Sequence, residues 1–458
     1  MRIALVSPNW RLSGGLFPTD TVRPPVSFPI EWGYVQSSSP DECSIFDEYG
    51  RNNTISQTVQ RLETFRPDAV VLSSTPSYLF WRCPPLSLRL LKELSRSIRG
   101  NPTLVGTQIW IVGPHGTQDP EFVLRSIPYA DWVFRGEIDV DLIPSVRSPE
   151  ASPFVASRGN TGKIAPEPLL GRCIYPSFLG DYEPHAWLNS VQMELSNGVS
   201  ALIESARGCP FSCGYCLRSG FRRNLRLKPL DILRMEIDEL GTSGVGYVFL
   251  IDETFGIPWS HASAVSRVVS EHGMTFGMQT RPELWSEERT DFLVEHGCVY
   301  VEAGIESSDP RALTKIDKFR APLSALAGLQ ALQSRVQHVG ANTFDVGNPD
   351  LKLMTTIEAE SLRDFEGRKP GAFIPYPGTE WGNHALLSLG VGAPCWSHAA
   401  AAYLLYRLMG RSRPLGWTLR RSRVLRILVF RMAFILKGLG GTISLGRTRY
   451  ETEIRDEP

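Results

Sequence analysis

The chain has 458 residues, and its 48 Lys plus Arg balance its 48 Asp plus Glu. This balance excludes the strongly basic surface that is typical of nucleic-acid-binding proteins, and eight cysteines are too few for a disulfide scaffold in so long a chain. No signal peptide and no uninterrupted run of about 18 apolar residues is evident. We therefore expect two or three domains, a reducing cytoplasm and no nucleic-acid partner.

The N-terminal part alternates short apolar runs with helical patterns, which predicts a parallel sheet covered on both faces. The expected strands are residues 2–7, 43–47, 67–74, 108–113 and 131–135, and the expected helices are 54–65, 86–98 and 120–126. Residues 10–42 are rich in Pro, Gly and Ser, so we expect a long loop there.

Small and polar residues follow three of these expected strands. Ligands of parallel sheets bind at the carboxyl ends of the strands, where small residues let a large flat ligand approach the backbone. Ordinary turn chemistry is the alternative, and a loop histidine is more often only hydrogen-bonded or solvated. The candidate binding residues are Ser73, Ser74, Gly113, His115, Gly116, Gly136 and Glu137.

Three cysteines, Cys209, Cys213 and Cys216, lie within eight residues. Thiolates are the usual ligands of iron–sulfur clusters, commonly four per cluster, so three can bind three irons and leave the fourth open. A zinc site and three unrelated thiols are the alternatives. Structural zinc needs four ligands, and no second Cys-x2-Cys pair follows. The spacing favours a cluster with an open iron.

Six strand–helix repeats follow, which indicates an open (β/α)6 barrel. Its expected strands are residues 201–206, 246–255, 275–281, 299–306, 339–347 and 372–379, and its expected helices are 228–240, 261–271, 287–295 and 322–333. Barrel catalysis occurs at the carboxyl ends of strands. The polar or small residues there are Asp252, Glu253, Arg281, Gly304 and Glu306. Each charged one could instead form a surface salt bridge.

The cysteine segment, with Tyr215 in its aromatic position, resembles the Cys-x3-Cys-x-aromatic-Cys signature of the radical S-adenosylmethionine (SAM) superfamily. The resemblance implies a [4Fe-4S] cluster, SAM bound to its open iron, a 5′-deoxyadenosyl radical, and an electron donor such as flavodoxin or ferredoxin. It also implies that Tyr215 lies against adenine. By the same resemblance Asp252, Glu253, Arg281, Gly304 and Glu306 line the SAM pocket. Residues 249–255 resemble the second-strand motif of cobalamin-type members, with Glu253 replacing an Asp.

The N-terminal strand endings together resemble the cobalamin-binding Rossmann-like domain that precedes many radical SAM domains. This resemblance implies that cobalamin, as methylcobalamin, binds at these endings. The chain lacks the Asp-x-His-x-x-Gly motif whose histidine ligates cobalt in methionine-synthase-like domains. Cobalamin without a histidine ligand is therefore implied, with His115 as a candidate neighbour.

The expected fold is α/β in four segments. Residues 1–140 form the Rossmann-like domain, 141–198 a linker, 199–382 the barrel and 383–458 a small helical cap. Residues 419–437 mix apolar residues with arginines, so a basic amphipathic helix on a membrane is an alternative to the cap. The zero net charge favours the cap, and we expect no membrane partner. The acidic tail 451–458 is expected to be disordered.

The expected function is methylation of an unactivated carbon, or of phosphorus, in a small-molecule intermediate of secondary (natural-product) metabolism by a B12-dependent radical SAM enzyme. The same architecture also supports cyclisation or rearrangement without methyl transfer. A cobalamin- or redox-responsive binding protein with a structural cluster is the non-enzymatic alternative.

Overall fold

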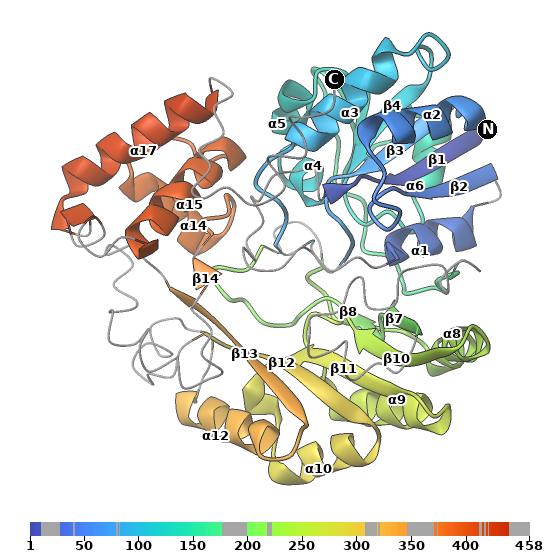
Figure 1. Cartoon of the computed structure of the whole chain (residues 1–458), viewed down its shortest axis with the longest axis vertical. Coiled ribbons are helices and arrows are strands. Elements are labelled where there is room, and N and C mark those ends of the chain that lie inside the picture. The colour runs from blue at the N-terminus through green and yellow to red at the C-terminus, as the bar shows by residue number, and fades with distance from the viewer. Residues whose placement is uncertain are drawn as a thin grey trace.

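The computed structural model has two parallel sheets facing each other and a separate group of C-terminal helices (Figure 1). It describes residues 1–10, 28–39, 42–78, 81, 83–175, 199–217, 222–306, 318, 321–345, 371–372, 374–411, 415, 418–419 and 421–438. The expected disordered tail lies outside these residues.

The first sheet has six strands in the order β2-β1-β3-β4-β5-β6. The strands are β1 (Arg2–Ser7), β2 (Glu42–Asp47), β3 (Ala69–Ser73), β4 (Gln108–Val112), β5 (Trp132–Phe134) and β6 (Val155–Ala156). The first five are parallel, and β6 pairs antiparallel with β5. The expected Rossmann-like sheet is confirmed, and its strand order reverses between β1 and β3, where such folds bind ligands.

Helices cover both faces of this sheet, as the alternating pattern predicts. They are α1 (Ile30–Ser38), α2 (Ile55–Phe65), α3 (Arg89–Gly100), α4 (Pro114–Gln118), α5 (Pro120–Ser126) and α6 (Leu142–Arg147). Helix α2 begins at a capping box, in which Gln57 N donates to Thr54 Oγ1 over 3.2 Å and Thr54 N donates to Gln57 Oε1 over 2.8 Å.

Helix α1 corrects the expectation of a long loop over residues 10–42. Its residues from Ile30 to Val35 are all buried, including Glu31. A helix that is buried on every side shows no apolar stripe, so the 3.6-residue period that reveals surface helices is missing from its sequence.

The segment expected as linker also carries regular structure. Helix α6 and strand β6 lie within it, and β6 extends the first sheet. The pairing of two β6 residues with Val133 and Phe134 cannot be read from so short a run. The division into domains at 141–198 remains a prediction.

The second sheet has six strands in the order β14-β13-β12-β11-β10-β7. The strands are β7 (Val199–Ile203), β10 (Val245–Leu250), β11 (Thr275–Thr280), β12 (Cys298–Glu306), β13 (His338–Asp345) and β14 (Gly371–Ala372). All are parallel and in chain order. This single-direction winding is that of the expected open (β/α)6 barrel.

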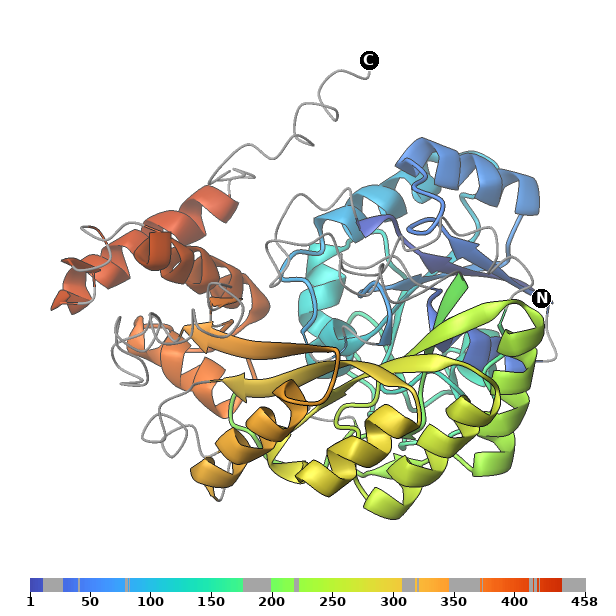
Figure 2. The same ribbon diagram turned by 60° about the horizontal axis from the view of Figure 1, so that its bottom comes forward.

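Helices cover the outer face of the second sheet, away from the N-terminal domain (Figure 2). They are α8 (Leu230–Thr242), α9 (Trp259–Glu271), α10 (Glu287–Glu295) and α12 (Pro322–Gln333), with a short 3-10 turn, η4 (Pro282–Leu284). A two-stranded ribbon of β8 (Ala206–Arg207) and β9 (Arg226–Leu227) follows β7 and faces the first domain.

Three further helices form the C-terminal part: α14 (Glu380–Ser388), α15 (Trp396–Arg411) and α17 (Arg423–Gly438). They confirm the expected helical character, and α17 packs on α15 at the outer edge of the molecule (Figure 1). Among the described residues, none of the helices is both long enough and apolar enough to cross a lipid bilayer.

Candidate functional site

The cysteine loop leaves the carboxyl end of β7, on the side of the second sheet that faces the N-terminal domain. Cys209, Cys213 and Cys216 are all partly buried, and none of the eight cysteines, which all lie in described stretches, forms a disulfide. Cys216 N donates to Cys213 O over 3.1 Å, which curls the last turn of the loop.

Polar groups surround the cysteine sulfurs. Arg281 Nη1 donates to Cys213 Sγ over 3.3 Å, and Thr254 Oγ1 lies 3.6 Å from Cys209 Sγ. The Arg281 guanidinium also stacks on the Phe211 ring at 3.7 Å. Hydrogen bonds to the sulfurs are one of the means by which a protein tunes an iron–sulfur cluster. This donor set fits an iron–sulfur cluster held by Cys209, Cys213 and Cys216.

Over the described residues, no group of three His, Cys, Asp or Glu side chains is close enough to hold a single metal ion. In a cubane cluster each of the three thiolates binds a different iron. The three sulfurs can therefore lie further apart than three ligands of a single ion.

Three of the expected SAM-pocket residues, Tyr215, Gly304 and Glu306, lie together with Lys318. Tyr215 Oη donates to Glu306 Oε1 over 2.9 Å, and Lys318 Nζ lies 2.5 Å from the same oxygen and 2.7 Å from Gly304 O. Glu306 has φ 67°, a left-handed conformation that is rare for a side chain of this size. Sequence reasoning missed Lys318, which follows a segment without readable periodicity. Burial raises the pKa of the Tyr215 hydroxyl, and Glu306 adds to that increase.

Asp252 and Glu253 contact the backbone of the cysteine loop region. Ser205 N and Oγ donate to Asp252 over 2.7 and 2.5 Å, and Gly208 N donates to Glu253 Oε2 over 2.8 Å. Gly208 has φ 89°, and an added Cβ would collide with the carbonyl of Asn224, so this turn requires glycine. Both carboxylates thus position the loop, and their roles towards SAM stay predictions.

Asp252 gives a pH dependence to the stability of the barrel. Burial raises the pKa of its carboxyl from 3.8 to about 7, although hydrogen bonds from Ser205 lower it. The folded protein keeps a proton that the unfolded chain has lost, so the free energy of unfolding falls as the pH rises through this range.

Because of Asp252, the free energy of unfolding of the wild type should fall by on the order of 2 kcal/mol between pH 5 and pH 7.5. We expect Asp252→Asn to remove this part of the decrease. The measurement is the urea midpoint of both proteins at the two pH values. Glu288→Gln, at an exposed position of α10, is the control and should leave the pH dependence unchanged. An Asp252→Asn variant with the full wild-type slope would contradict the raised pKa.

The structure brings together Ser74, Gly113 and His115 of the proposed cobalamin residues. His115 Nε2 lies 2.6 Å from Pro85 O and Nδ1 lies 3.0 Å from Ser74 Oγ. Because a carbonyl only accepts, Nε2 carries the proton and Ser74 donates to Nδ1. Gly113 has φ 117°, and an added Cβ would strike Ser74 Oγ. Gly113 is the N-cap of helix α4, and His115 and Gly116 lie in the first turn of that helix.

His115 is fully buried and stays neutral. Burial lowers its pKa to about 4, and its ring stacks on Trp396 of α15 at 4.4 Å between centroids. Three buried side-chain atoms near these strand ends have no hydrogen-bond partner among the described residues: Ser77 Oγ, Gln118 Oε1 and Trp396 Nε1. Buried polar atoms without partners are costly, so the region fits a ligand with polar side groups, such as cobalamin.

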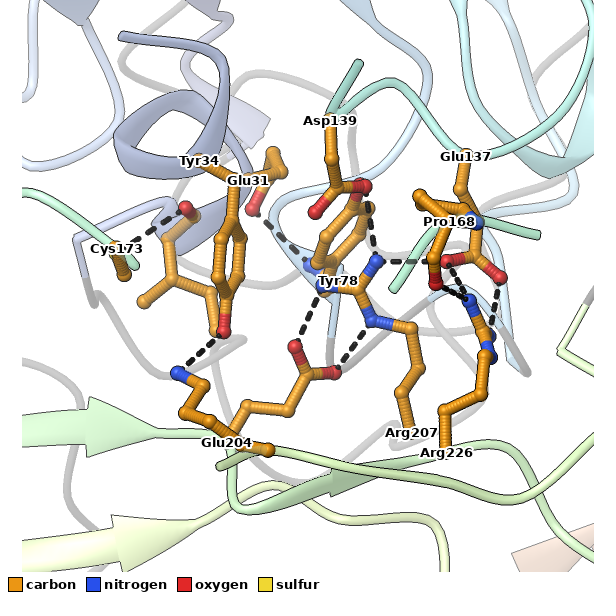
Figure 3. Close-up of polar contacts among 12 residues, drawn as sticks. Glu31, Tyr34, Tyr78, Glu137, Asp139, Pro168, Cys173, Glu204, Arg207 and Arg226 are labelled. Carbon is orange, nitrogen blue, oxygen red and sulfur yellow. Dashed lines mark hydrogen bonds and ion pairs between the residues drawn. The ribbon is translucent and has the colours of Figure 1, made fainter. Parts of the chain in front are cut away.

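The other four proposed cobalamin residues, which also lie at the ends of strands of the first sheet or follow them, have contacts of their own. Ser73 Oγ donates to Thr75 O over 2.7 Å, Gly136 N donates to Thr117 Oγ1 over 3.0 Å, and Gly116 packs on Val133. Glu137 does not turn towards His115. It points at the barrel domain instead, where it meets two arginines (Figure 3).

Arg207, two residues before Cys209, is the centre of a buried network that joins the two sheets (Figure 3). Its Nη1 lies 2.6 Å from Glu137 and 2.8 Å from Asp139, and its Nη2 lies 2.6 Å from Glu204. The Arg207, Glu137 and Glu204 side chains are fully buried. We call Arg207, Glu137, Asp139, Glu204 and Arg226 the interdomain joint.

Further contacts fix the interdomain joint. Arg226 makes two contacts with Glu137, at 2.7 and 3.0 Å. The Arg207 guanidinium lies 4.6 Å from the Tyr78 ring and 5.0 Å from the Tyr34 ring, both on the N-terminal side. Burial alone would raise the pKa of the Glu137 carboxyl, but Arg207 and Arg226 lower it to about 2. Glu137 is therefore charged at every physiological pH.

Comparisons with known proteins agree with this architecture. The family model of the radical SAM superfamily matches residues 203–344. An uncharacterised methyltransferase of Pyrococcus horikoshii is 25% identical over 385 residues, covering 78% of each chain. An anaerobic magnesium-protoporphyrin IX monomethyl ester cyclase of Rubrivivax gelatinosus is 23% identical over 336 residues, covering 69% of this chain and 58% of that protein.

A solved structure shares the fold over most of the chain. It is the radical SAM methyltransferase TsrM of Kitasatospora setae with cobalamin and a [4Fe-4S] cluster bound. The TM-score is 0.61 at 16% identity, over 86% of this chain and 76% of TsrM. Residues 203–344 therefore match the radical SAM superfamily, and most of the chain shares the fold of TsrM.

Proposed function

We propose that this enzyme is a B12-dependent radical SAM methyltransferase that acts on an unactivated carbon of a small-molecule intermediate in specialised metabolism. One observation carries the proposal. The cysteine loop is tied, through Arg207, to Glu137 and Asp139 just beyond the last parallel strand of the N-terminal sheet. This contact supports the proposal because it joins the cysteine loop to the N-terminal sheet, whose strand ends carry the proposed cobalamin residues.

In this proposal Cys209, Cys213 and Cys216 hold a [4Fe-4S] cluster, and Tyr215, Gly304, Glu306 and Arg281 border SAM. Ser73, Ser74, Gly113, His115, Gly116 and Gly136 border cobalamin. When bound, the cluster supplies the electron that cleaves SAM, and cobalamin carries the methyl group.

The chain's own residues position these groups and exclude water. Arg281 donates to the Cys213 sulfur and positions it within the loop. Lys318 fixes the Glu306 carboxylate, which in turn orients the Tyr215 hydroxyl. The interdomain joint removes water from the contact between the two domains, because its arginines and carboxylates satisfy one another.

The relatives leave a second reaction open. The cyclase of Rubrivivax gelatinosus supports cyclisation or rearrangement without methyl transfer. A reducing electron donor such as flavodoxin or ferredoxin is part of either proposal, and the cytoplasm is the proposed location.

An anaerobic assay with SAM carrying a labelled methyl carbon separates these reactions. The reconstituted enzyme receives reduced cobalamin, SAM and reductant. We expect labelled methyl on bound cobalamin and 5′-deoxyadenosine in solution. Formation of deoxyadenosine without methyl transfer would indicate that the reaction is a cyclisation or rearrangement and not a methylation. If neither product forms, the remaining interpretation is a binding protein whose cluster is structural.

A further inference from the structure

Helix α17 carries an apolar stripe on its outer face. Val424, Leu428 and Ile435 are spaced by four and seven residues, which places them along one side of a helix. Met432 lies beside them. Their exposed fractions are 70%, 52%, 60% and 62%, whereas Phe430 and Ala433 on the inner face are each 4% exposed.

The stripe lies at the periphery of the molecule. Figures 1 and 2 show α17 on the outer edge of the C-terminal helices, with α15 between it and the rest of the chain. Four adjoining large apolar side chains in water form a patch of the kind that marks an interaction surface, unlike a single exposed leucine.

The stretch of sequence that contains this stripe carries charge of one sign. Residues 381–450 contain eleven basic residues and no Asp or Glu, although the whole chain is neutral. The basic residues are Arg407, Arg411, Arg413, Arg420, Arg421, Arg423, Arg426, Arg431, Lys437, Arg447 and Arg449. On α17 itself, Arg423 and Arg431 are exposed.

Arg431 stands within the stripe, one turn after Leu428 and one turn before Ile435. An arginine there can bury its methylene groups among apolar side chains while its guanidinium reaches a phosphate at the surface. Apolar side chains flanked by exposed arginines, in a stretch of 70 residues without Asp or Glu, match the acyl chains and negative headgroups of an anionic lipid surface.

We propose that α17 docks this enzyme on an anionic membrane surface, with the helix lying in the plane of the headgroups. The expected cap stays a prediction: the inner face of α17 packs on α15, and its outer face carries the apolar stripe together with Arg423 and Arg431. The docking is independent of the reaction that the barrel catalyses.

The test is flotation of the full-length reconstituted protein with lipid vesicles. One set is phosphatidylcholine alone, and the other contains about one third phosphatidylglycerol. We expect binding to the anionic vesicles, weakened by salt, and little binding to the neutral ones.

Two pairs of substitutions separate the apolar from the electrostatic contribution to vesicle binding. Leu428→Glu with Ile435→Glu should lower the partition coefficient at least about tenfold, since two anchors become anions. Arg423→Gln with Arg431→Gln should lower it roughly fivefold for each charge removed, with the preference for anionic lipid reduced. Leu323→Glu, at a position of α12 that is 71% exposed, is the matched control and should bind as the wild type does.

Both pairs should keep the thermal midpoint, the cluster absorbance and the rate of deoxyadenosine formation, because the four side chains are exposed on α17. The proposal is overturned if the wild type does not bind anionic vesicles, or if the Leu428→Glu, Ile435→Glu protein binds as well as the Leu323→Glu control. It is also overturned if the wild type is a dimer that the stripe substitutions dissociate, since a second copy would then cover the stripe.

Discussion

Replacing any one of Cys209, Cys213 and Cys216 by alanine is expected to lower the rate of 5′-deoxyadenosine formation from SAM at least about 10³-fold, because one iron loses its protein ligand. The three thiols are partly buried within one loop, next to Arg281 and Thr254, so no other described cysteine can substitute for them.

The readouts are iron content, cluster absorbance and deoxyadenosine formed under anaerobic conditions with dithionite. Cys395→Ala, which removes a partly buried thiol 3.0 Å from His398 Nδ1 and outside the loop, is the control and should keep all three values. A single loop variant with wild-type iron content and rate would show that the cluster is bound elsewhere.

Replacing Arg207 by methionine is expected to cost about 3–5 kcal/mol of unfolding free energy, since it leaves the buried carboxylates of Glu137, Asp139 and Glu204 without their shared cation. The same change should reduce cluster content, because Arg207 is two residues from Cys209. The urea midpoint and the iron content per chain are the measurements.

A double-mutant cycle tests whether the interdomain joint couples the two domains. Arg207→Met combined with Glu137→Gln should cost less than the sum of the two single changes, because each removes a partner of the other. Arg234→Met breaks the half-exposed ion pair with Glu271 at 2.6 Å and should cost less than about 1 kcal/mol. Additive effects of Arg207 and Glu137 would contradict the coupling.

The sequence predicts most of the two sheets because parallel strands buried on both faces are continuous apolar runs with clear ends. Strands β1, β3 and β4 are of this kind, and so is β10. Helix α1 is not predicted because its residues from Ile30 to Val35 are buried on every side, which leaves no apolar stripe in the sequence. Strand β6 is not predicted because two residues are too few to show an alternating pattern.

The interdomain joint could not be predicted in the same way. Arg207 lies inside the motif that draws attention to the cysteines, but its partner Glu137 is 70 residues away. Only the fold decides that Glu137 turns to the barrel while His115 turns inward. Likewise, the basic character of α17 is legible in the sequence, whereas the exposure of Val424 and Leu428 depends on which face α15 covers.

The central claim is that one chain holds an iron–sulfur cluster and cobalamin across the interdomain joint. Anaerobic purification, reconstitution with iron and sulfide, addition of hydroxocobalamin and removal of unbound cofactor, followed by the ultraviolet–visible spectrum, tests it most directly. Retained corrin bands together with a cluster that dithionite bleaches are the predicted result. A cluster that forms while no cobalamin is retained would contradict the claim and remove the methyl carrier from the proposed reaction.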